Sequence, residues 1–193
     1  MANYTRIAPL YDPVVALLDR TRARSIADID IRPGERVLIP GIGTGRDLAY
    51  LSPDTPIRAV DFTPAMLERA KARAAGFVDA DLRVGDAMAL PFAEASCDVA
   101  LLHLIVAVVS DGRAALAEAA RVVRPGGRAA LLDKFVPPGM SDTLFRLVDP
   151  LARAVATGVA VRFEDVVGPE WEILSDEAAA LFGFVRRIRL RRR

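Results

Sequence analysis

A glycine-rich segment near residue 40 contains the residues best suited to ligand chemistry. It reads Pro40-Gly41-Ile42-Gly43-Thr44-Gly45 and directly follows the apolar run 37–39. Glycine lets a backbone turn tightly and lets a ligand approach without a Cβ in the way. The first turn of a following helix would present unpaired N–H groups to a carboxylate or phosphate. The segment therefore predicts a ligand-binding loop, although the same glycines also suit a plain strand-to-helix turn.

An acidic residue follows the next apolar run. Asp61 lies twenty residues after Gly41, at the end of the run 57–60. A carboxylate at this place in an α/β unit accepts hydrogen bonds from ribose hydroxyls. The glycines and the acid together predict a nucleoside site more specifically than the glycines do by themselves.

A third segment extends this pattern to the base of a nucleoside. Asp86 and Ala87 follow a third apolar run, and an aspartate there can accept a hydrogen bond from an adenine amino group. Phe62, Met66 and Met88 could enclose the adenine ring. The alternative is that Asp86 caps a turn and the methionines fill the core, which is the commoner role of methionine.

These residues need a frame of alternating strands and helices, and the sequence supplies one from residue 36 onward. Apolar runs with helical segments between them are typical of an α/β sheet. Thr63 and Pro64 form a helix start, with a capping hydroxyl followed by proline. Asp111 could shape a pocket but more simply begins a turn. The expected strands are 37–39, 57–61, 82–84, 98–103, 128–134, 171–174 and 184–190, and the expected helices are 11–18, 46–51, 63–75, 114–123, 142–156 and 176–181.

Composition limits the class of protein. The chain has 193 residues, of which 52% are hydrophobic, enough for one domain with a sizeable core. A formal net charge of +1 argues against a dedicated nucleic-acid binder. The single cysteine, Cys97, permits no internal disulfide and fits a reducing compartment. The chain does not begin like a signal peptide, and its apolar runs are too short to span a bilayer, so a cytoplasmic protein is expected.

The carboxyl-terminal segment 186–193 is strongly basic. Its arginines could rest on an anionic membrane surface, as a peripheral contact with the inner face of the membrane. The preferred interpretation is an exposed edge strand whose arginines point outward and block aggregation. Oligomeric state is not indicated by the sequence.

Together, these segments resemble the motifs of class I S-adenosylmethionine (SAM)-dependent methyltransferases. Residues 37–45 resemble motif I, residues 60–67 the segment after it, residues 85–98 motif II and its approach, and residues 124–127 motif III. The resemblance implies SAM as cofactor and a Rossmann-like, doubly wound α/β sheet of seven strands with an antiparallel last strand. No metal site is expected. The implied cofactor contacts are Pro40, Gly41, Ile42, Gly43, Thr44, Gly45, Asp61, Phe62, Met66, Asp86, Ala87 and His103.

The two ends of the chain suggest an acceptor. Residues 4–12 resemble the amino-terminal lid of small-molecule methyltransferases. The resemblance implies lid helices in 1–30 and a methyltransferase domain in 31–193. It also implies catalytic contacts from Tyr4 and Tyr11. Tyr11 also suits packing on the sheet. The tail resembles bacterial phosphatidylethanolamine N-methyltransferases and, more distantly, ubiquinone and menaquinone C-methyltransferases. The expected acceptor is a small molecule or lipid head group, with phosphatidylethanolamine as first candidate and a quinone or other metabolite as the alternative.

His103 is the only histidine and ends the run 98–103, where ligands gather at an open α/β sheet. A primary amine has a reference pKa of about 10.4, so an amine acceptor would need to lose a proton before it attacks a methyl group. We therefore place His103 among the catalytic candidates as a proton relay or head-group contact. The alternative is a partly buried histidine bonded to backbone.

One position departs from the family pattern. The family usually has Asp or Glu two residues before the first glycine, where this sequence has Ile39. Cofactor affinity could be lower as a result, or Asp47 or another group could compensate. The departure also leaves open a SAM-binding protein without turnover.

Overall fold

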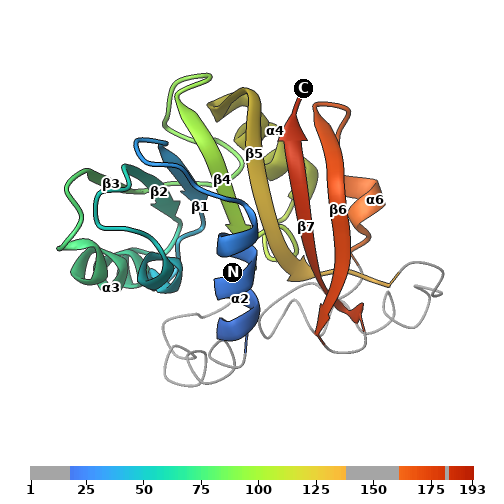
Figure 1. Ribbon diagram of the computed structural model, residues 1–193, viewed down its shortest axis with the longest axis horizontal. Helices are drawn as coiled ribbons and strands as arrows, with labels where there is room; N and C mark the ends of the chain where they lie inside the picture. The colour runs from blue at the N-terminus through green and yellow to red at the C-terminus, as the bar shows by residue number, and fades with distance from the viewer. Residues whose placement is uncertain (1–17, 138–160, 181–182) are drawn as a thin grey trace.

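The computed structural model describes residues 18–137, 161–180 and 183–193 and contains one seven-stranded sheet (Figure 1). The strand order is β3-β2-β1-β4-β5-β7-β6. The first five strands are parallel, and β7 runs antiparallel to both β5 and β6, as expected for this fold class. The strands are β1 (Val37–Pro40), β2 (Ile57–Asp61), β3 (Ala80–Val84), β4 (Cys97–His103), β5 (Val123–Lys134), β6 (Trp171–Ala180) and β7 (Val185–Arg192).

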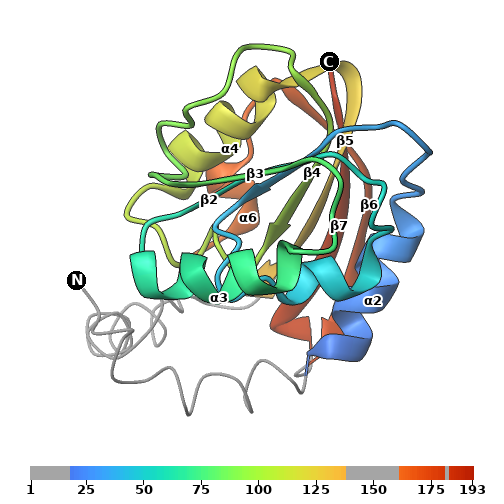
Figure 2. The same cartoon turned by 90° about the vertical axis from the view of Figure 1, so that its left-hand side faces the viewer.

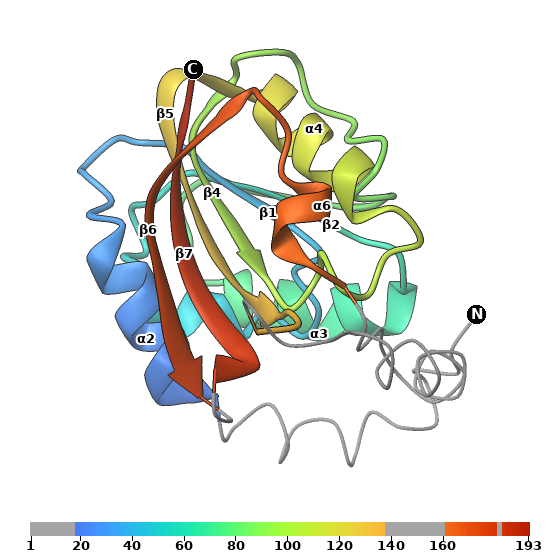
Figure 3. The same cartoon turned by 90° about the vertical axis from the view of Figure 1, so that its right-hand side faces the viewer.

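Helices cover both faces of the sheet (Figures 2 and 3). On one face lie α2 (Asp19–Asp28), the 3₁₀ helix η1 (Arg46–Tyr50) and α3 (Pro64–Ala74). On the other lie α4 (Gly112–Val122) and the short α6 (Phe163–Val166). Because the central strands are buried on both faces, β1 and β4 are almost continuously apolar, as parallel strands usually are. This burial fixes the positions of β1 and β4, and so of the edge of the sheet at which the parallel strands end.

Several elements differ locally from the sequence prediction. The segment after the glycines is a five-residue 3₁₀ helix. Residues 124–127 interrupt β5: Val123 pairs with Cys97, the next pair joins Arg128 to Val99, and Gly126 has a φ of +77°. The turn predicted there is thus a bulge inside the strand. Asp111 caps α4 by accepting a hydrogen bond from the Ala114 N–H at 3.0 Å, so it begins a helix where the sequence predicted a turn.

The predicted helix 176–181 is wrong for residues 176–180, which continue β6. Asp176 lies opposite Ile188 and Glu177 lies opposite Arg187 in the antiparallel ladder with β7. Ladder hydrogen bonds and ion pairs to the arginines of β7 stabilise the extended form. Tertiary pairing therefore overrides the local helical preference.

The basic tail is interior to the sheet, because β6 and not β7 forms the edge. The interpretation of 186–193 as an edge strand is therefore wrong. Arg186, Arg187 and Arg191 pair with acidic side chains, which compensates their charge, and Arg189 and Arg192 donate to neutral oxygens. The partners are Asp176 and Glu164 for Arg186, Asp28 and Glu177 for Arg187, Ser175 and the Asp28 carbonyl for Arg189, Glu172 for Arg191, and the Ala120 carbonyl for Arg192. Among the described residues, no helix is long and apolar enough to cross a membrane.

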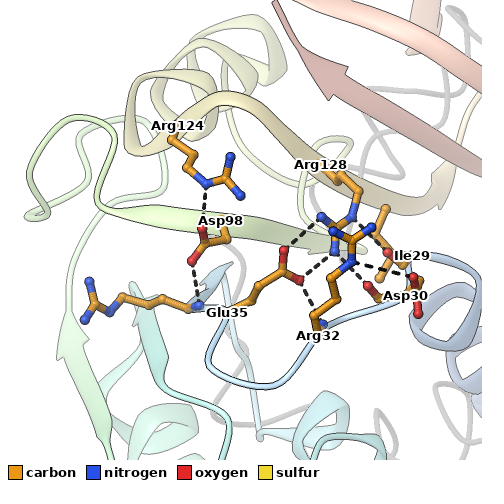
Figure 4. A network of polar contacts seen from close by, with 8 residues as sticks. Ile29, Asp30, Arg32, Glu35, Asp98, Arg124 and Arg128 are labelled. Carbon is orange, nitrogen blue, oxygen red and sulfur yellow. Dashed lines mark hydrogen bonds and ion pairs between the residues drawn. The ribbon is translucent and has the colours of Figure 1, made fainter.

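A polar network fixes the carboxyl end of α2 to the amino edge of the sheet (Figure 4). Arg128 of β5 donates to the carbonyls of Ile29 and Asp30 and forms a two-point ion pair with Glu35, at 3.0 and 2.6 Å. Its hydrogen bonds hold the pKa of the Glu35 carboxyl below the usual value. This network lies at the end of the strands away from the glycines, so its role is structural.

We expect Arg128→Met to lower the free energy of unfolding by about 1–3 kcal/mol, because a charged donor is lost by one carboxylate and two carbonyls. Since the pKa of Glu35 is depressed, the contribution of the pair is present at neutral pH and lost as pH falls through the folded pKa. Urea denaturation at pH 7 and in acid measures both effects. Lys71→Met breaks the exposed pair with Glu68 and serves as control, with an expected change below about 0.5 kcal/mol. Equal losses in the two variants would contradict the anchoring role.

Candidate functional site

The glycine-rich segment forms a tight loop at the carboxyl end of β1. Gly41, Gly43 and Gly45 have φ values of +77°, +58° and +80°, a region that favours glycine. The N–H groups of Gly41 and Ile42 both donate to the Val60 carbonyl of β2, at 2.8 and 2.9 Å. The loop is therefore attached to the strand that carries the acid.

Asp61 faces this loop. One carboxylate oxygen accepts from the Gly43 N–H at 2.7 Å, and the other from the Thr63 N–H at 2.8 Å. Burial raises the pKa of Asp61, and the two backbone hydrogen bonds only partly oppose it. Each carboxylate oxygen has two acceptor sites, so capacity remains for ligand hydroxyls beside the loop.

The residues expected around the adenine lie at the ends of β2 and β3. The Phe62 side chain, next to Asp61, is 61% exposed, which is unusual for a large apolar ring. Met66 and Ala87 are buried. One carboxylate oxygen of Asp86 accepts from the Met88 N–H at 2.8 Å, as in the turn-capping interpretation, and leaves its other oxygen to serve as an acceptor. An apolar surface and two acids thus lie around the same edge of the sheet.

The remaining loop residues support the backbone. Pro40, Ile42 and Thr44 are buried, and Arg73 of α3 donates to the Thr44 carbonyl. A Cβ placed on Gly45 would come within 3.0 Å of the Ala70 backbone, so α3 packs closely against the end of the loop. The side chains of this group are therefore packed inward and contribute mainly by fixing the loop.

His103 ends β4, and its side chain is completely buried. Its Nδ1 lies 2.8 Å from an Asp47 carboxylate oxygen, and its Nε2 lies 3.1 Å from the Ser25 hydroxyl. Arg22 donates to the same Asp47 oxygen. Burial opposes the charge of Asp47, but the His103 ring and the Arg22 guanidinium outweigh it and hold the pKa of Asp47 well below its usual value.

Sequence reasoning did not find the partners of His103. Arg22 and Ser25 lie three residues apart and share the buried face of α2 with Ile26. A buried arginine and serine on a helix are a local signal of a polar contact, but they do not identify a partner 78 or 25 residues away. Only the packing of α2 against β4 and η1 brings the four groups together.

Asp133 is a second residue that sequence reasoning missed. It is fully buried near the carboxyl end of β5 and accepts from the Ala107 N–H at 3.1 Å and from the Lys134 N–H at 2.8 Å. Burial raises its pKa against those hydrogen bonds. The segment that it holds follows β4 and begins with Leu104, whose φ of +58° is uncommon for a non-glycine residue. Asp133 thus supports the backbone next to the candidate site.

The described residues fit SAM. A Cβ on Gly43 would meet nothing within 4 Å, so the loop backbone is open at that point, while the Asp61 carboxylate and the exposed Phe62 ring lie beside it. Ile39 is 1% exposed and packs in the core, so it offers the cofactor nothing. Tyr4 and Tyr11 lie outside the described residues.

We expect Gly41→Ala to weaken SAM binding at least about tenfold and to lower the free energy of unfolding by about 1–3 kcal/mol. Its φ of +77° disfavours alanine, and the new Cβ would lie 2.4 Å from Ile105 Cδ1. Titration calorimetry and thermal unfolding measure the two effects. Gly76→Ala is the control, because Gly76 lies outside the left-handed region and its Cβ would meet nothing within 4 Å. Unchanged SAM affinity in Gly41→Ala would contradict the loop's role.

Comparisons with known proteins agree with this geometry. A family model described as a methyltransferase domain matches residues 38–131. A ubiquinone/menaquinone biosynthesis C-methyltransferase of Dinoroseobacter shibae is 34% identical over 170 residues, which cover 79% of this chain and 68% of that protein. A demethylmenaquinone methyltransferase of Beutenbergia cavernae is 35% identical over 148 residues, which cover 72% of this chain. The chain spans about 60% of the length of that second relative.

A solved structure with the same fold is the methyltransferase in complex with the Trm112 methyltransferase activator of Haloferax volcanii. It superposes with a TM-score of 0.75 at 17% identity and covers 100% of this chain and 98% of that one. The names of both sequence relatives refer to quinones, so the comparison supports the quinone alternative better than the expected likeness to phosphatidylethanolamine N-methyltransferases. With its sheet order, glycine loop and second-strand acid, the chain belongs to the class I SAM-dependent methyltransferases.

Proposed function

We propose that this protein transfers the methyl group of SAM to a small-molecule acceptor of the quinone-precursor class. The observation that carries the proposal is the Asp61 carboxylate, held 2.7 Å from the Gly43 N–H beside the exposed Phe62 ring. The quinone names of two relatives support the acceptor class. A lipid head-group amine is the competing acceptor.

When bound, SAM supplies an electrophilic methyl group on a positively charged sulfur. The Asp61 carboxylate would accept hydrogen bonds from the ribose hydroxyls, the exposed Phe62 ring would be available to cover the adenine, and the open backbone at Gly43 would let the nucleoside approach closely. An electron-rich acceptor carbon would attack the methyl carbon as the S–CH₃ electron pair passes to sulfur, and the acceptor would then lose a proton. Positioning in a dry site supplies most of the rate, because this transfer needs little covalent help.

We assign His103 a positioning role in this reaction. Both ring nitrogens are engaged, by Asp47 and Ser25, and the side chain is fully buried. A proton relay through His103 would require one of those hydrogen bonds to break. Tyr4 and Tyr11 stay candidates for contacts with the acceptor and with the methionine end of the cofactor.

Asp61→Ala should weaken SAM binding by about 10- to 100-fold, because charged hydrogen bonds of about 1.5–3 kcal/mol are lost. The ionised carboxylate is the binding form, so wild-type affinity should fall as pH is lowered through the Asp61 pKa. Burial raises that pKa, so the fall should begin at a higher pH than an ordinary aspartate would give. Calorimetry between pH 4 and 8 with SAM measures both effects. Unchanged affinity in the variant, or no SAM binding by the wild type, would refute the assignment.

The acceptor class is tested with radiolabelled SAM. Purified protein is incubated in parallel with a reduced demethylmenaquinone and with phosphatidylethanolamine vesicles, and the extracted products are separated by chromatography. We expect label in the quinone product, with Asp61→Ala as the inactive control. Label in the lipid alone would replace the quinone proposal with the amine one. Tight SAM binding with no label in either fraction or in cell extract would favour a SAM-binding protein without turnover.

A further inference from the structure

Two ion pairs join the amino end of α2 to the helix that leaves the glycine loop. Asp19 of α2 pairs with Arg46 of η1, with an Arg46 Nε to Asp19 Oδ1 distance of 3.2 Å and a second bond from Nη2. Arg22 of α2 pairs with Asp47 of η1. Each helix therefore contributes one cation and one anion, three residues apart on α2 and adjacent on η1. We call these four residues the α2–η1 clamp.

The two pairs differ in burial. The Asp19 and Arg46 side chains are 29% and 21% exposed, whereas those of Arg22 and Asp47 are 6% and 5% exposed. A contact of 3.9 Å between Arg22 Nε and Asp19 Oδ1 connects the outer pair to the inner one. Charges this deeply buried are costly unless they are paired and hydrogen-bonded. The arrangement is thus strongly tied to one relative placement of α2 and η1.

The inner pair reaches the end of β4. The Asp47 oxygen that accepts from Arg22 also accepts from the His103 ring at 2.8 Å, and the other ring nitrogen meets Ser25 on α2. Arg22 and Ser25, on one face of α2, therefore bond to η1 and to the end of β4, respectively. Among the described residues Arg22 Nε has no hydrogen-bond partner, so the network constrains the geometry through Arg22 Nη1, Asp47, His103 and Ser25.

The clamp acts on the glycine loop because η1 directly follows that loop in the chain. Arg46 directly follows Gly45, the last glycine of the loop, so a shift of η1 moves the loop backbone itself. The other side of the loop is held by Arg73, which donates to the Thr44 carbonyl. Ile39, two residues before the first glycine, is 1% exposed and offers no charge to the loop. Asp47, two residues after Gly45, is the acid of η1 that bonds to both α2 and β4.

We propose that the α2–η1 clamp is a positioning device that fixes the exit of the glycine loop and so sets the affinity for SAM. Through its pairs with Arg22 and His103, Asp47 orders η1 directly after the loop. The proposal rests on the proposed function, because it assumes that the loop binds SAM. The clamp residues touch other residues of this chain and act on the cofactor only through the loop.

The outer pair offers a charge-swap test, because its partly exposed side chains tolerate reversal. Asp19→Arg and Arg46→Asp are made singly and together, and SAM affinity is measured by calorimetry. Each single variant should weaken SAM binding about five- to tenfold, since attraction becomes repulsion across the clamp. The double variant should bind SAM more tightly than either single variant, with incomplete recovery because the reversed charge at position 19 lies next to Arg22. Single variants with wild-type affinity, or a double variant at least as weak as the singles, would overturn the proposal.

Two controls separate positioning from general loss of structure. Asp79→Arg reverses a similarly exposed pair with Arg58 at the amino end of β2, away from the loop, and should leave SAM affinity within about twofold of wild type. Glu35→Gln loosens the opposite end of α2 and should lower the unfolding temperature with little change in affinity. If Glu35→Gln weakens SAM binding as much as the clamp variants, any loosening of α2 suffices and the clamp has no specific role.

The inner pair provides an independent variant. Asp47→Asn keeps the side-chain shape and one carbonyl acceptor but removes the charge opposite Arg22. We expect SAM binding to weaken more than in the outer variants, with the product S-adenosylhomocysteine affected alike. If this variant does not fold, the outer-pair swap still decides. Failure of wild type to bind SAM would overturn the proposed function and the clamp with it, whereas binding that is insensitive to all clamp variants would overturn the clamp alone.

Discussion

The hydrogen bond from the Gly43 N–H to the Asp61 carboxylate connects the two parts of the cofactor site, and it depends on the parallel register of β1 and β2. Pro40 lies opposite Val60, so Gly41 and Asp61 both follow the same pair and lie at the same edge of the sheet. A shift of one residue would turn Asp61 toward the other face. Burial of both strands on both faces prevents that shift, and the hydrophobic core thereby sets the geometry of the site.

The helix α2 is held at both ends by charges, with apolar contacts between them. At its carboxyl end, Arg128 binds the carbonyls of Ile29 and Asp30 (Figure 4), and at its amino end the clamp joins η1. Ile26 and Ile29 fill the space between with core contacts. The charged ends determine where along the sheet the helix sits, because buried charges tolerate few alternative positions. This division explains how one helix can be both part of the core and a neighbour of the cofactor loop.

The backbone that follows β4 is less regular than the strands around it. Leu104 holds a left-handed conformation at the end of β4, and Asp133 accepts from the Ala107 N–H just beyond it. Strained or specially supported backbone of this kind is common next to functional sites, because the surrounding fold must stabilise it. One methyltransferase frame can serve many acceptors, since the loops after the strands vary while the cofactor edge stays fixed. The acceptor class is therefore supported by the names of relatives, whereas the cofactor is supported by the geometry of the glycine loop and Asp61.

The sequence by itself determined the features that depend on neighbours in the chain. The glycine loop, Asp61, the helix that begins at Pro64 and the alternation of strands and helices follow from local spacing and the burial of apolar runs, although the Thr63 hydroxyl makes no capping hydrogen bond. Tertiary structure decided what depends on distant segments. Residues 176–180 became a strand because β7 offers ladder partners, and the tail arginines became interior because β6 covers them. His103 met Asp47, Ser25 and, through Asp47, Arg22 only after α2 packed on the sheet, since periodicity identifies a buried face but not the side chain that it will meet.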